Sequence, residues 1–336
     1  MDKCEALTHT FSPVNLKLLA VSSALLLASF SWPLFGRAAQ LPYDKHTHTY
    51  KTVEQCKIHL TTYRMPGEEV RPAILWIHGG ALICGHRSNI PEEQLKGYLD
   101  AGFVLVSIDY RLAPETKLKA IIEDLRDAAQ WLRSNGPRLL KIDPDRLAVV
   151  GHSAGGYLTL MSGFCLNPRP RALVAFYGYG DITREWYSRP DPFYNQEPAV
   201  SKEEAYQAVD GRPVSEGSDN RGQFYLYCRQ QGLWPWEVAG HDPDKEPRAF
   251  DPFCPIRNVT KDCPPTLLLH GNKDTDVPYQ QSVDMAEVLK RHGVEHDFIT
   301  VTNGAHDFDG ENGGLKDPAN RERFQRVLDF LKHHTK

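Results

Sequence analysis

A serine between glycines stands in the middle of the sequence AVVGHSAGGYLTL, at residues 148–160. Ser153 fits the pattern Gly-x-Ser-x-Gly, with β-favouring apolar residues before it and an apolar, helix-compatible run after it. A tight turn from strand to helix lifts a serine hydroxyl clear of the sheet, and the first N–H groups of the helix favour an anion beside it. The pattern therefore predicts that Ser153 is a nucleophile.

A serine hydroxyl needs a base to remove its proton and an acid to orient that base. After a strand–turn–helix of this kind, the acid and then a histidine follow along the chain, each in a loop after a strand. The sequence HGNKDTDVP offers Asp274 and Asp276, and VTNGAHDF offers His306. The pattern H-G-x-x-D-x-x-V-P favours Asp274 as the acid. Asp276 stays open as the alternative acid, or as a turn-forming side chain.

Attack on a carbonyl also requires N–H donors for the negative oxygen that forms. The sequence HGGAL at residues 78–82 follows a short apolar run that is typical of a buried strand. We predict an oxyanion hole built from the N–H groups of Gly80, Ala81 and Ala154. Each such donor stabilises a transition state by about 3 kcal/mol.

The elements that must position these residues follow a regular alternation. Strands are predicted at residues 53–63, 73–77, 103–108, 146–150, 172–176, 266–270 and 296–301. Helices are predicted at residues 119–133, 158–164, 280–291 and 318–332, and Gly136-Pro137 is read as the stop of the first. This order indicates an α/β fold, with a mostly parallel central sheet and helices on both faces. Ligands bind such sheets beyond the carboxyl ends of the strands, where the motifs above fall.

The alternation breaks down between residues 181 and 262, which are rich in Pro, Gly, charged and aromatic residues. An irregular loop of that length is unusual inside a compact domain. We predict an inserted cap with helices at residues 203–209 and 220–231. Most of its aromatic side chains are expected to form the core of the cap itself.

Composition limits the class of partner. The chain has 336 residues, 41% of them hydrophobic, and a formal net charge of −4. It offers no basic field for nucleic acid, so we expect a small-molecule partner. Seven cysteines occur without a CxxC pair, and we expect neither a metal nor a cofactor. Cys254 and Cys263 form the most plausible disulfide, with free thiols as the equal alternative.

The first 39 residues are expected to be an export signal, with an uncleaved N-terminal anchor as the alternative. The apolar run at residues 18–30 is shorter than a membrane span of about 20 residues, and Lys17 precedes it. Asp2, Glu5 and Arg37 are atypical of a signal peptide. We therefore expect a secreted or periplasmic protein without a stable membrane span in its mature form, and leave its oligomeric state open.

Four motifs occur in one order along the chain: HGGA at 78–81, DYRLAPE at 109–115, IDPDRLAVVGHSAGG at 142–156, and the loops that carry Asp274 and His306. From about residue 73 onward, the cap excepted, the chain resembles the hormone-sensitive-lipase-like and bacterial esterase/lipase group of the α/β-hydrolase superfamily. The resemblance implies a triad of Ser153, Asp274 and His306, an oxyanion hole at Gly80, Ala81 and Ala154, and a structural brace at residues 109–115. Ala81 and His152 depart from the group's usual Gly and Asp, which moves the chain toward feruloyl-esterase-like and peptidase-related branches.

The expected function is therefore hydrolysis of carboxylic esters through an acyl-enzyme intermediate, by a domain at residues 40–336 with an α/β-hydrolase fold and a cap at about residues 181–262. One alternative is a serine peptidase related to the prolyl-oligopeptidase group, which shares the acid and histidine loops. Another is a catalytically inactive binding module on the same fold.

Overall fold

A computed structural model of the protein describes residues 42–209, 211–217, 220–310 and 314–336. The expected export segment at residues 1–39 lies outside these ranges. Within them, no helix combines the length and the apolar character that crossing a membrane requires.

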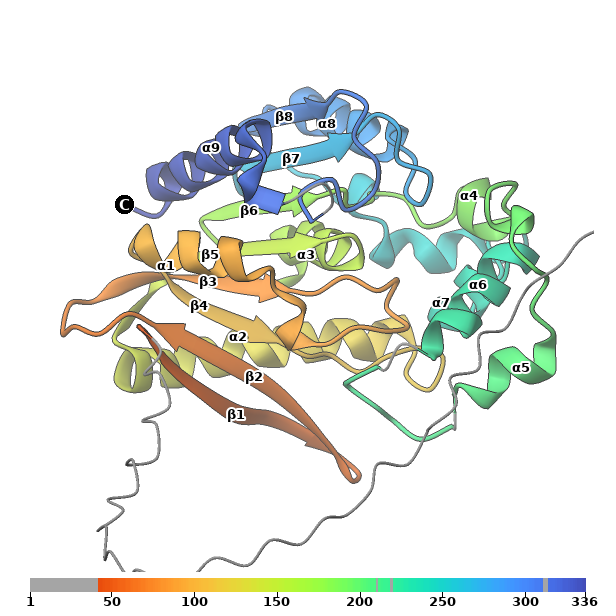
Figure 1. The fold of residues 1–336 in the computed structure, drawn as a ribbon, viewed down its shortest axis with the longest axis horizontal. Helices are drawn as coiled ribbons and strands as arrows, with labels where there is room; N and C mark the ends of the chain where they lie inside the picture. Colours follow the sequence, from red (N-terminus) through yellow and green to blue (C-terminus); the bar gives the residue numbers. More distant parts are fainter. Residues whose placement is uncertain (1–41, 210, 218–219, 311–313) are drawn as a thin grey trace, which may run out of the picture. The chain divides into compact units, whose positions relative to one another are not determined.

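The described strands form one eight-stranded sheet in the order β1-β2-β4-β3-β5-β6-β7-β8 (Figure 1). They are β1 Asp44–Val53, β2 Cys56–Arg64, β3 Arg71–Ile77, β4 Val104–Ile108, β5 Ile142–His152, β6 Ala172–Phe176, β7 Thr266–Gly271 and β8 His296–Val301. The β1–β2 and β2–β4 pairs are antiparallel, and the other pairs are parallel. The predicted α/β class with a mostly parallel sheet is confirmed.

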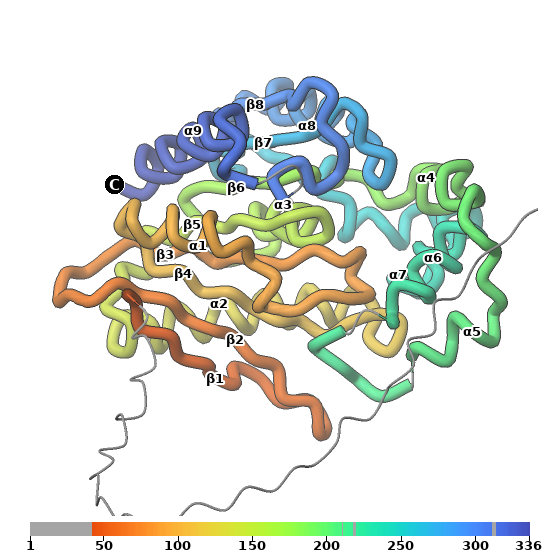
Figure 2. Tube along the Cα trace, in the orientation of Figure 1, coloured from red at the N-terminus to blue at the C-terminus, as the bar shows by residue number. Residues whose placement is uncertain are grey.

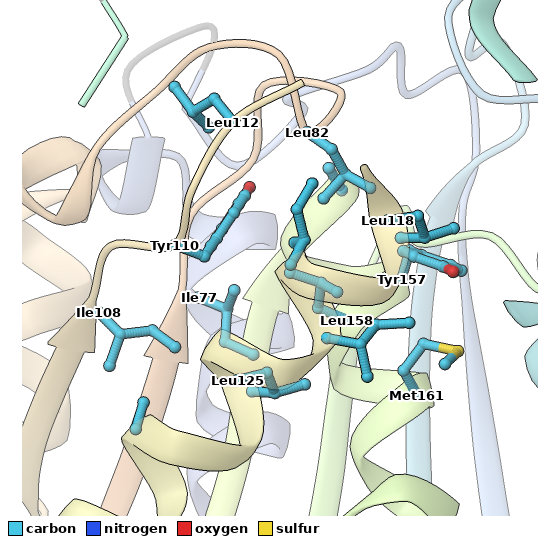
Figure 3. Packing of buried hydrophobic residues seen from close by; sticks show 14 of the residues in the cluster. Ile77, Leu82, Ile108, Tyr110, Leu112, Leu118, Leu125, Tyr157, Leu158 and Met161 are labelled. Carbon is cyan, nitrogen blue, oxygen red and sulfur yellow. The ribbon is translucent and has the colours of Figure 1, made fainter. Parts of the chain in front are cut away.

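Helices cover both faces of this sheet (Figure 1). They are α1 Glu92–Asp100, α2 Leu118–Leu140, α3 Ala154–Cys165, α8 Gln280–Arg291 and α9 Pro318–His334. Alternate residues of β3 point to opposite faces. Leu75 and Ile77 lie in the core with α2 and α3, and Figure 3 shows part of this cluster. Ile74 and Trp76 lie in a second core with α1 and α9.

The segment between β6 and β7, residues 181–262, is called the cap segment below. It contains the short helices α4 Glu185–Ser188, α5 Lys202–Gln207, α6 Arg221–Gln231 and α7 Trp234–Ala239. Figure 2 shows these helices together beyond the end of the sheet toward which the parallel strands run. Tyr187 and Trp234 are buried and stack with ring centroids 4.0 Å apart. Both rings belong to the same buried cluster as Leu75 and Ile77, so the cap segment shares a core with the sheet and does not form the separate core that was predicted.

Two predicted boundaries are wrong. The predicted strand at residues 53–63 includes a turn, because β1 ends at Val53 and β2 begins at Cys56. Gly136-Pro137 does not end α2, which continues to Leu140. Gly136 lies so close to β5 that a Cβ there would be 2.5 Å from Ile142 Cδ1, and Leu140 is buried. Packing of the last turns therefore outweighs the hydrogen bond that a helical proline removes.

The cysteines in the described part of the chain are free thiols. The Cys254–Cys263 disulfide is therefore absent, and the alternative of free thiols holds. Cys254 is buried, and its Sγ lies 3.6 Å from Asp181 Oδ1, so that thiol donates to a carboxylate instead. Cys4 lies outside the described residues.

Candidate active site

Ser153 occupies the sharp turn between β5 and α3. Its backbone has φ 53° and ψ −118°, which is a strained conformation for a residue with a side chain. The turn is held by a hydrogen bond from Ser153 N to Phe176 O at 2.9 Å, and Tyr157 N donates to Ser153 O at 2.9 Å. Gly155 lets α3 approach β3, because a Cβ there would lie 2.1 Å from Ile77 O. The chain thus sets a serine hydroxyl beyond the end of the central strand.

His306 and Asp274 come from the loops after β8 and β7. The Nδ1 of His306 lies 2.7 Å from Oδ2 of Asp274. The Oδ1 of Asp274 accepts hydrogen bonds from Asp276 N and Val277 N, at 2.8 and 2.9 Å. Burial by itself raises the pKa of Asp274, but hydrogen bonds from His270 and His306 outweigh it and hold that pKa well below its ordinary value. Asp274 is therefore a carboxylate that orients the ring of His306.

The other nitrogen of His306 faces a second acid. Its Nε2 lies 3.5 Å from Oδ2 of Asp276. Burial lowers the pKa of His306, but the bond to Asp274 and the charges of Asp276 and Asp307 raise it to about 9. Across the described ranges, no hydrogen bond joins the Ser153 hydroxyl to His306. Ser153, His306 and Asp276 nevertheless line one cavity of about 730 Å³.

The loop after β3, at residues 78–86, carries the predicted oxyanion donors and is called the oxyanion loop below. Gly80 and Ala81 have φ of 102° and 55°, and both line the same cavity. Gly80 O accepts hydrogen bonds from Ile83 N and Cys84 N at 2.8 and 2.9 Å. Because the peptide N–H points away from its C=O, these bonds turn the Ala81 N–H to the opposite side. Ala154 is the first residue of α3, where an N–H has no acceptor within the helix.

Residues behind the oxyanion loop brace it, as the DYRLAPE motif suggested. The Tyr110 hydroxyl donates to His78 O at 3.0 Å, and its ring stacks on His78 with centroids 4.2 Å apart. Burial lowers the pKa of His78 to about 4, so that ring is neutral at pH 7. Ala113 N donates to Leu82 O at 2.8 Å.

The cap segment adds two braces that sequence reasoning missed. Arg221 of α6 donates to Ile83 O at 2.6 Å and forms a buried ion pair with Glu115 at 2.7 Å. Trp234 of α7 donates from Nε1 to Ala81 O at 3.0 Å. Both contacts join residues more than 100 positions apart, so no local pattern in the sequence points to them.

Asp309 is a further residue of the cavity that the sequence did not reveal. His152 Nε2 lies 2.9 Å from Asp309 Oδ2, and the Tyr177 hydroxyl donates to Asp309 Oδ1 at 2.8 Å. Burial raises the pKa of Asp309, but the electrostatic attraction of His152 and hydrogen bonds from His152, Tyr177 and Gln94 hold it below its ordinary value. The unusual His152 therefore has a carboxylate partner. The only sequence signal was a second acid close behind His306.

Among the described residues, one group of potential metal ligands brings its atoms within 4.8 Å of one another: Glu295, His333 and His334. None of the three lines the cavity.

Comparisons with known proteins agree with this architecture. Residues 74–310 match a family described as alpha/beta hydrolase fold. An alpha/beta hydrolase superfamily protein from Enterococcus faecalis is 25% identical, with a TM-score of 0.65 over 86% of this chain and 98% of that one. A structure of fungal esterases from Rhizomucor miehei is 19% identical, with a TM-score of 0.62 over 87% of this chain and 84% of that one, and it shows the fold alone.

Curated relatives are much longer proteins. The non-reducing polyketide synthase adrD of Penicillium rubens is 29% identical over 313 residues, which covers 79% of this chain and 12% of the synthase. The non-reducing polyketide synthase ausA of Aspergillus calidoustus is 31% identical over 316 residues, which covers 79% of this chain and 13% of the synthase. The chain thus spans less than one seventh of these relatives. Since the family match covers most of the chain and the sheet has the expected order, this protein belongs to the α/β hydrolase family.

Proposed function

We propose that the protein is a serine hydrolase that cleaves carboxylic esters through an acyl-enzyme intermediate. One observation carries the proposal: His306, held 2.7 Å from the buried Asp274, lines the same cavity as the strained Ser153. An activated nucleophile needs such a base, held in one orientation by a buried acid. The loop with Gly80 and Ala81 lines that cavity too and supports an oxyanion hole there.

In the proposed reaction, His306 Nε2 removes the proton of Ser153 as Oγ attacks the ester carbonyl carbon. The carbonyl oxygen becomes an oxyanion and accepts hydrogen bonds from the N–H groups of Gly80, Ala81 and Ala154. The C–O bond to the alcohol then breaks, and the alcohol leaves with the proton from His306. Water, deprotonated by His306, attacks the acyl carbon and releases the acid, and Ser153 regains its proton. Asp274 stabilises the imidazolium at each stage.

The first step requires Ser153 and His306 to come into hydrogen-bond contact. Such contacts are often long in unliganded enzymes and tighten when substrate binds. His306 must then turn its Nε2 from Asp276 toward Ser153, a change that a bound ester in the cavity would favour.

Replacement of Ser153 tests the proposal directly. Ser153→Ala is expected to lower kcat/KM for p-nitrophenyl acetate by at least about 10³-fold and to abolish labelling by a fluorophosphonate. Ser134→Ala, at an exposed serine on α2, is the matched control and should leave both unchanged. Full activity in Ser153→Ala would exclude the mechanism, and an unlabelled wild-type protein would favour an inactive binding module.

A second candidate substrate class comes from the relatives. Because synthases named for polyketides match 79% of this chain, a β-keto acyl ester is a candidate substrate. A β-keto acyl ester and a saturated ester of equal length and with the same alcohol should then differ in kcat/KM by about tenfold or more, in favour of the keto compound. Equal values would leave a general esterase. Hydrolysis of an aminoacyl amide at the rate of the ester would instead favour the peptidase alternative.

A further inference from the structure

The carboxylate of Asp276 is shared between His306 and the cap segment. Its Oδ2 lies 3.5 Å from His306 Nε2. Its Oδ1 accepts hydrogen bonds from the hydroxyls of Tyr194 and Tyr225, at 2.8 and 2.5 Å, and from Arg229 Nη1 at 2.5 Å. Tyr225 and Arg229 belong to α6. One carboxylate thus connects the cap segment to the nitrogen that would act as base.

The charges around His306 come from several elements. Asp274 contacts Nδ1 from the loop after β7, and Asp307 follows His306 in its own loop. Tyr177, after β6, packs its ring against His306 with centroids 4.6 Å apart. Asp276 completes the set at Nε2, so negative groups face both ring nitrogens. An imidazole between two carboxylates binds a proton more tightly than an imidazole beside one.

Arg229 limits the charge that Asp276 presents to His306. Its guanidinium is almost fully buried and pairs with both Asp276 and Asp191. Aromatic rings of the cap segment surround it, with that of Tyr194 4.3 Å from its central carbon. Because Arg229 and Tyr225 of α6 and Tyr194 before it all donate to Oδ1, the position of the cap segment affects how much negative charge is left on Oδ2.

We propose that Asp276 is a positioning residue in the ester hydrolysis proposed above. In the resting enzyme its carboxylate holds a proton on His306 Nε2, and the cap segment controls how strongly that proton is held. Release of that proton is then the step that Asp276 opposes. Tyr225 and Asp276 both line the cavity, so a substrate that contacts them weakens this hold as it binds. The inference rests on Ser153 and His306 acting as proposed.

The test is the pH dependence of kcat/KM, which reports the ionisation of groups in the free enzyme. Asp276→Asn removes the charge at Nε2 and keeps the size of the side chain. The acidic limb of this pH profile is the range over which kcat/KM rises with pH. In Asp276→Asn we expect that limb to move down by about one pH unit, because a charge at this distance shifts a pKa by about 1–3 units. Activity at pH 7 then rises by up to about tenfold. A merely structural residue would lower activity without moving the limb.

Two further variants sharpen the test. Tyr194→Phe removes a donor from Asp276, leaves more negative charge beside His306, and should move the limb upward. Asp297→Asn is the control for net charge, because Asp297 pairs with Arg326 on the surface, both about half exposed, and does not line the cavity. Its limb should match that of the wild type.

The outcomes separate this inference from the proposed function. An acidic limb that stays in place or moves up in Asp276→Asn overturns the role of Asp276, provided that Ser153→Ala is inactive. If Asp276→Asn does not fold, an unmoved limb in Tyr194→Phe overturns it instead. If Ser153→Ala keeps full activity, the proposed function itself fails.

Discussion

Replacing Gly155 by alanine tests whether the close approach of α3 to β3 holds the candidate oxyanion donors in place. A Cβ at this position would lie 2.1 Å from Ile77 O and 2.6 Å from His78 O. Carbon and oxygen in contact normally lie at least about 3.3 Å apart, so α3 and the end of β3 must separate by about 1 Å. The oxyanion loop begins at His78 and would move with that strand.

Two effects follow from this separation. Overpacking of this kind costs about 1–3 kcal/mol, and the better helix propensity of alanine offsets about 1 kcal/mol at most. We therefore expect a net loss of up to about 2–3 kcal/mol in the free energy of unfolding. A displacement of about 1 Å between nucleophile and oxyanion donors should lower kcat by about 10²-fold, with a smaller change in KM.

Urea unfolding followed by circular dichroism gives the stability, and hydrolysis of p-nitrophenyl acetate gives kcat. Gly222→Ala is the matched control for stability, because Gly222 holds the same second position in α6 and a Cβ there would meet nothing within 4 Å. It should be as stable as the wild type or up to about 1 kcal/mol more stable. Wild-type kcat and stability in Gly155→Ala would refute the reasoning.

Three further predictions concern the charges and braces of the site. Asp274→Asn should lower kcat/KM by about 10³–10⁴-fold. The pKa of Asp274 is lower in the folded protein than in the unfolded chain. The stability that its carboxylate contributes is therefore complete above the unfolded pKa of about 4, and is lost as pH falls through the folded pKa. The difference in Tm between wild type and Asp274→Asn should therefore shrink on acidification from pH 6 to pH 2. The pKa of His306 is raised to about 9, so kcat/KM should rise with pH through that value, and an acidic limb near 6.5 would contradict this. The stability that His306 contributes is complete below about pH 6.5 and is lost as pH rises through 9, which thermal unfolding across that range measures. Trp234→Phe removes the indole N–H that donates to Ala81 O, and should lower the free energy of unfolding in urea by about 1–3 kcal/mol. We also expect a lower kcat and a similar KM. An unchanged kcat would show that this contact of the cap segment does not position the oxyanion loop.

Local patterns predicted the turn and the loops that carry the candidate site residues. The Gly-x-Ser-x-Gly turn between an apolar run and a helix is a local device, and the structure has it between β5 and α3. The loops with Asp274 and His306 follow β7 and β8, because parallel strands end at one edge of the sheet. For Asp274 against Asp276 the sequence favoured one acid, and in the structure Asp274 is the one bonded to Nδ1 of His306.

Two of the departures from the predictions came from side-chain contacts rather than from local propensity. Gly136-Pro137 was read as a stop, but packing on Ile142 carries α2 onward to Leu140. A Cys254–Cys263 disulfide was suggested by nearness in sequence, with free thiols as the equal alternative, and in the structure the thiol of Cys254 donates to Asp181. Local propensity contains no information on the contact of Gly136 with Ile142 or on that of Cys254 with Asp181.

The sequence by itself determined the alternation of strands and helices, the position of Ser153 on a strained turn, and the order of acid and histidine after it. These depend on periodicity, glycine placement and chain order, which are properties of neighbouring residues. Only the tertiary structure decided that His152 pairs with Asp309, that Trp234 holds the oxyanion loop, and that Asp276 joins the cap segment to His306. Each of these contacts brings together side chains from loops and helices separated by 30 to more than 150 residues, and only the packed fold puts them within hydrogen-bonding or ion-pairing distance.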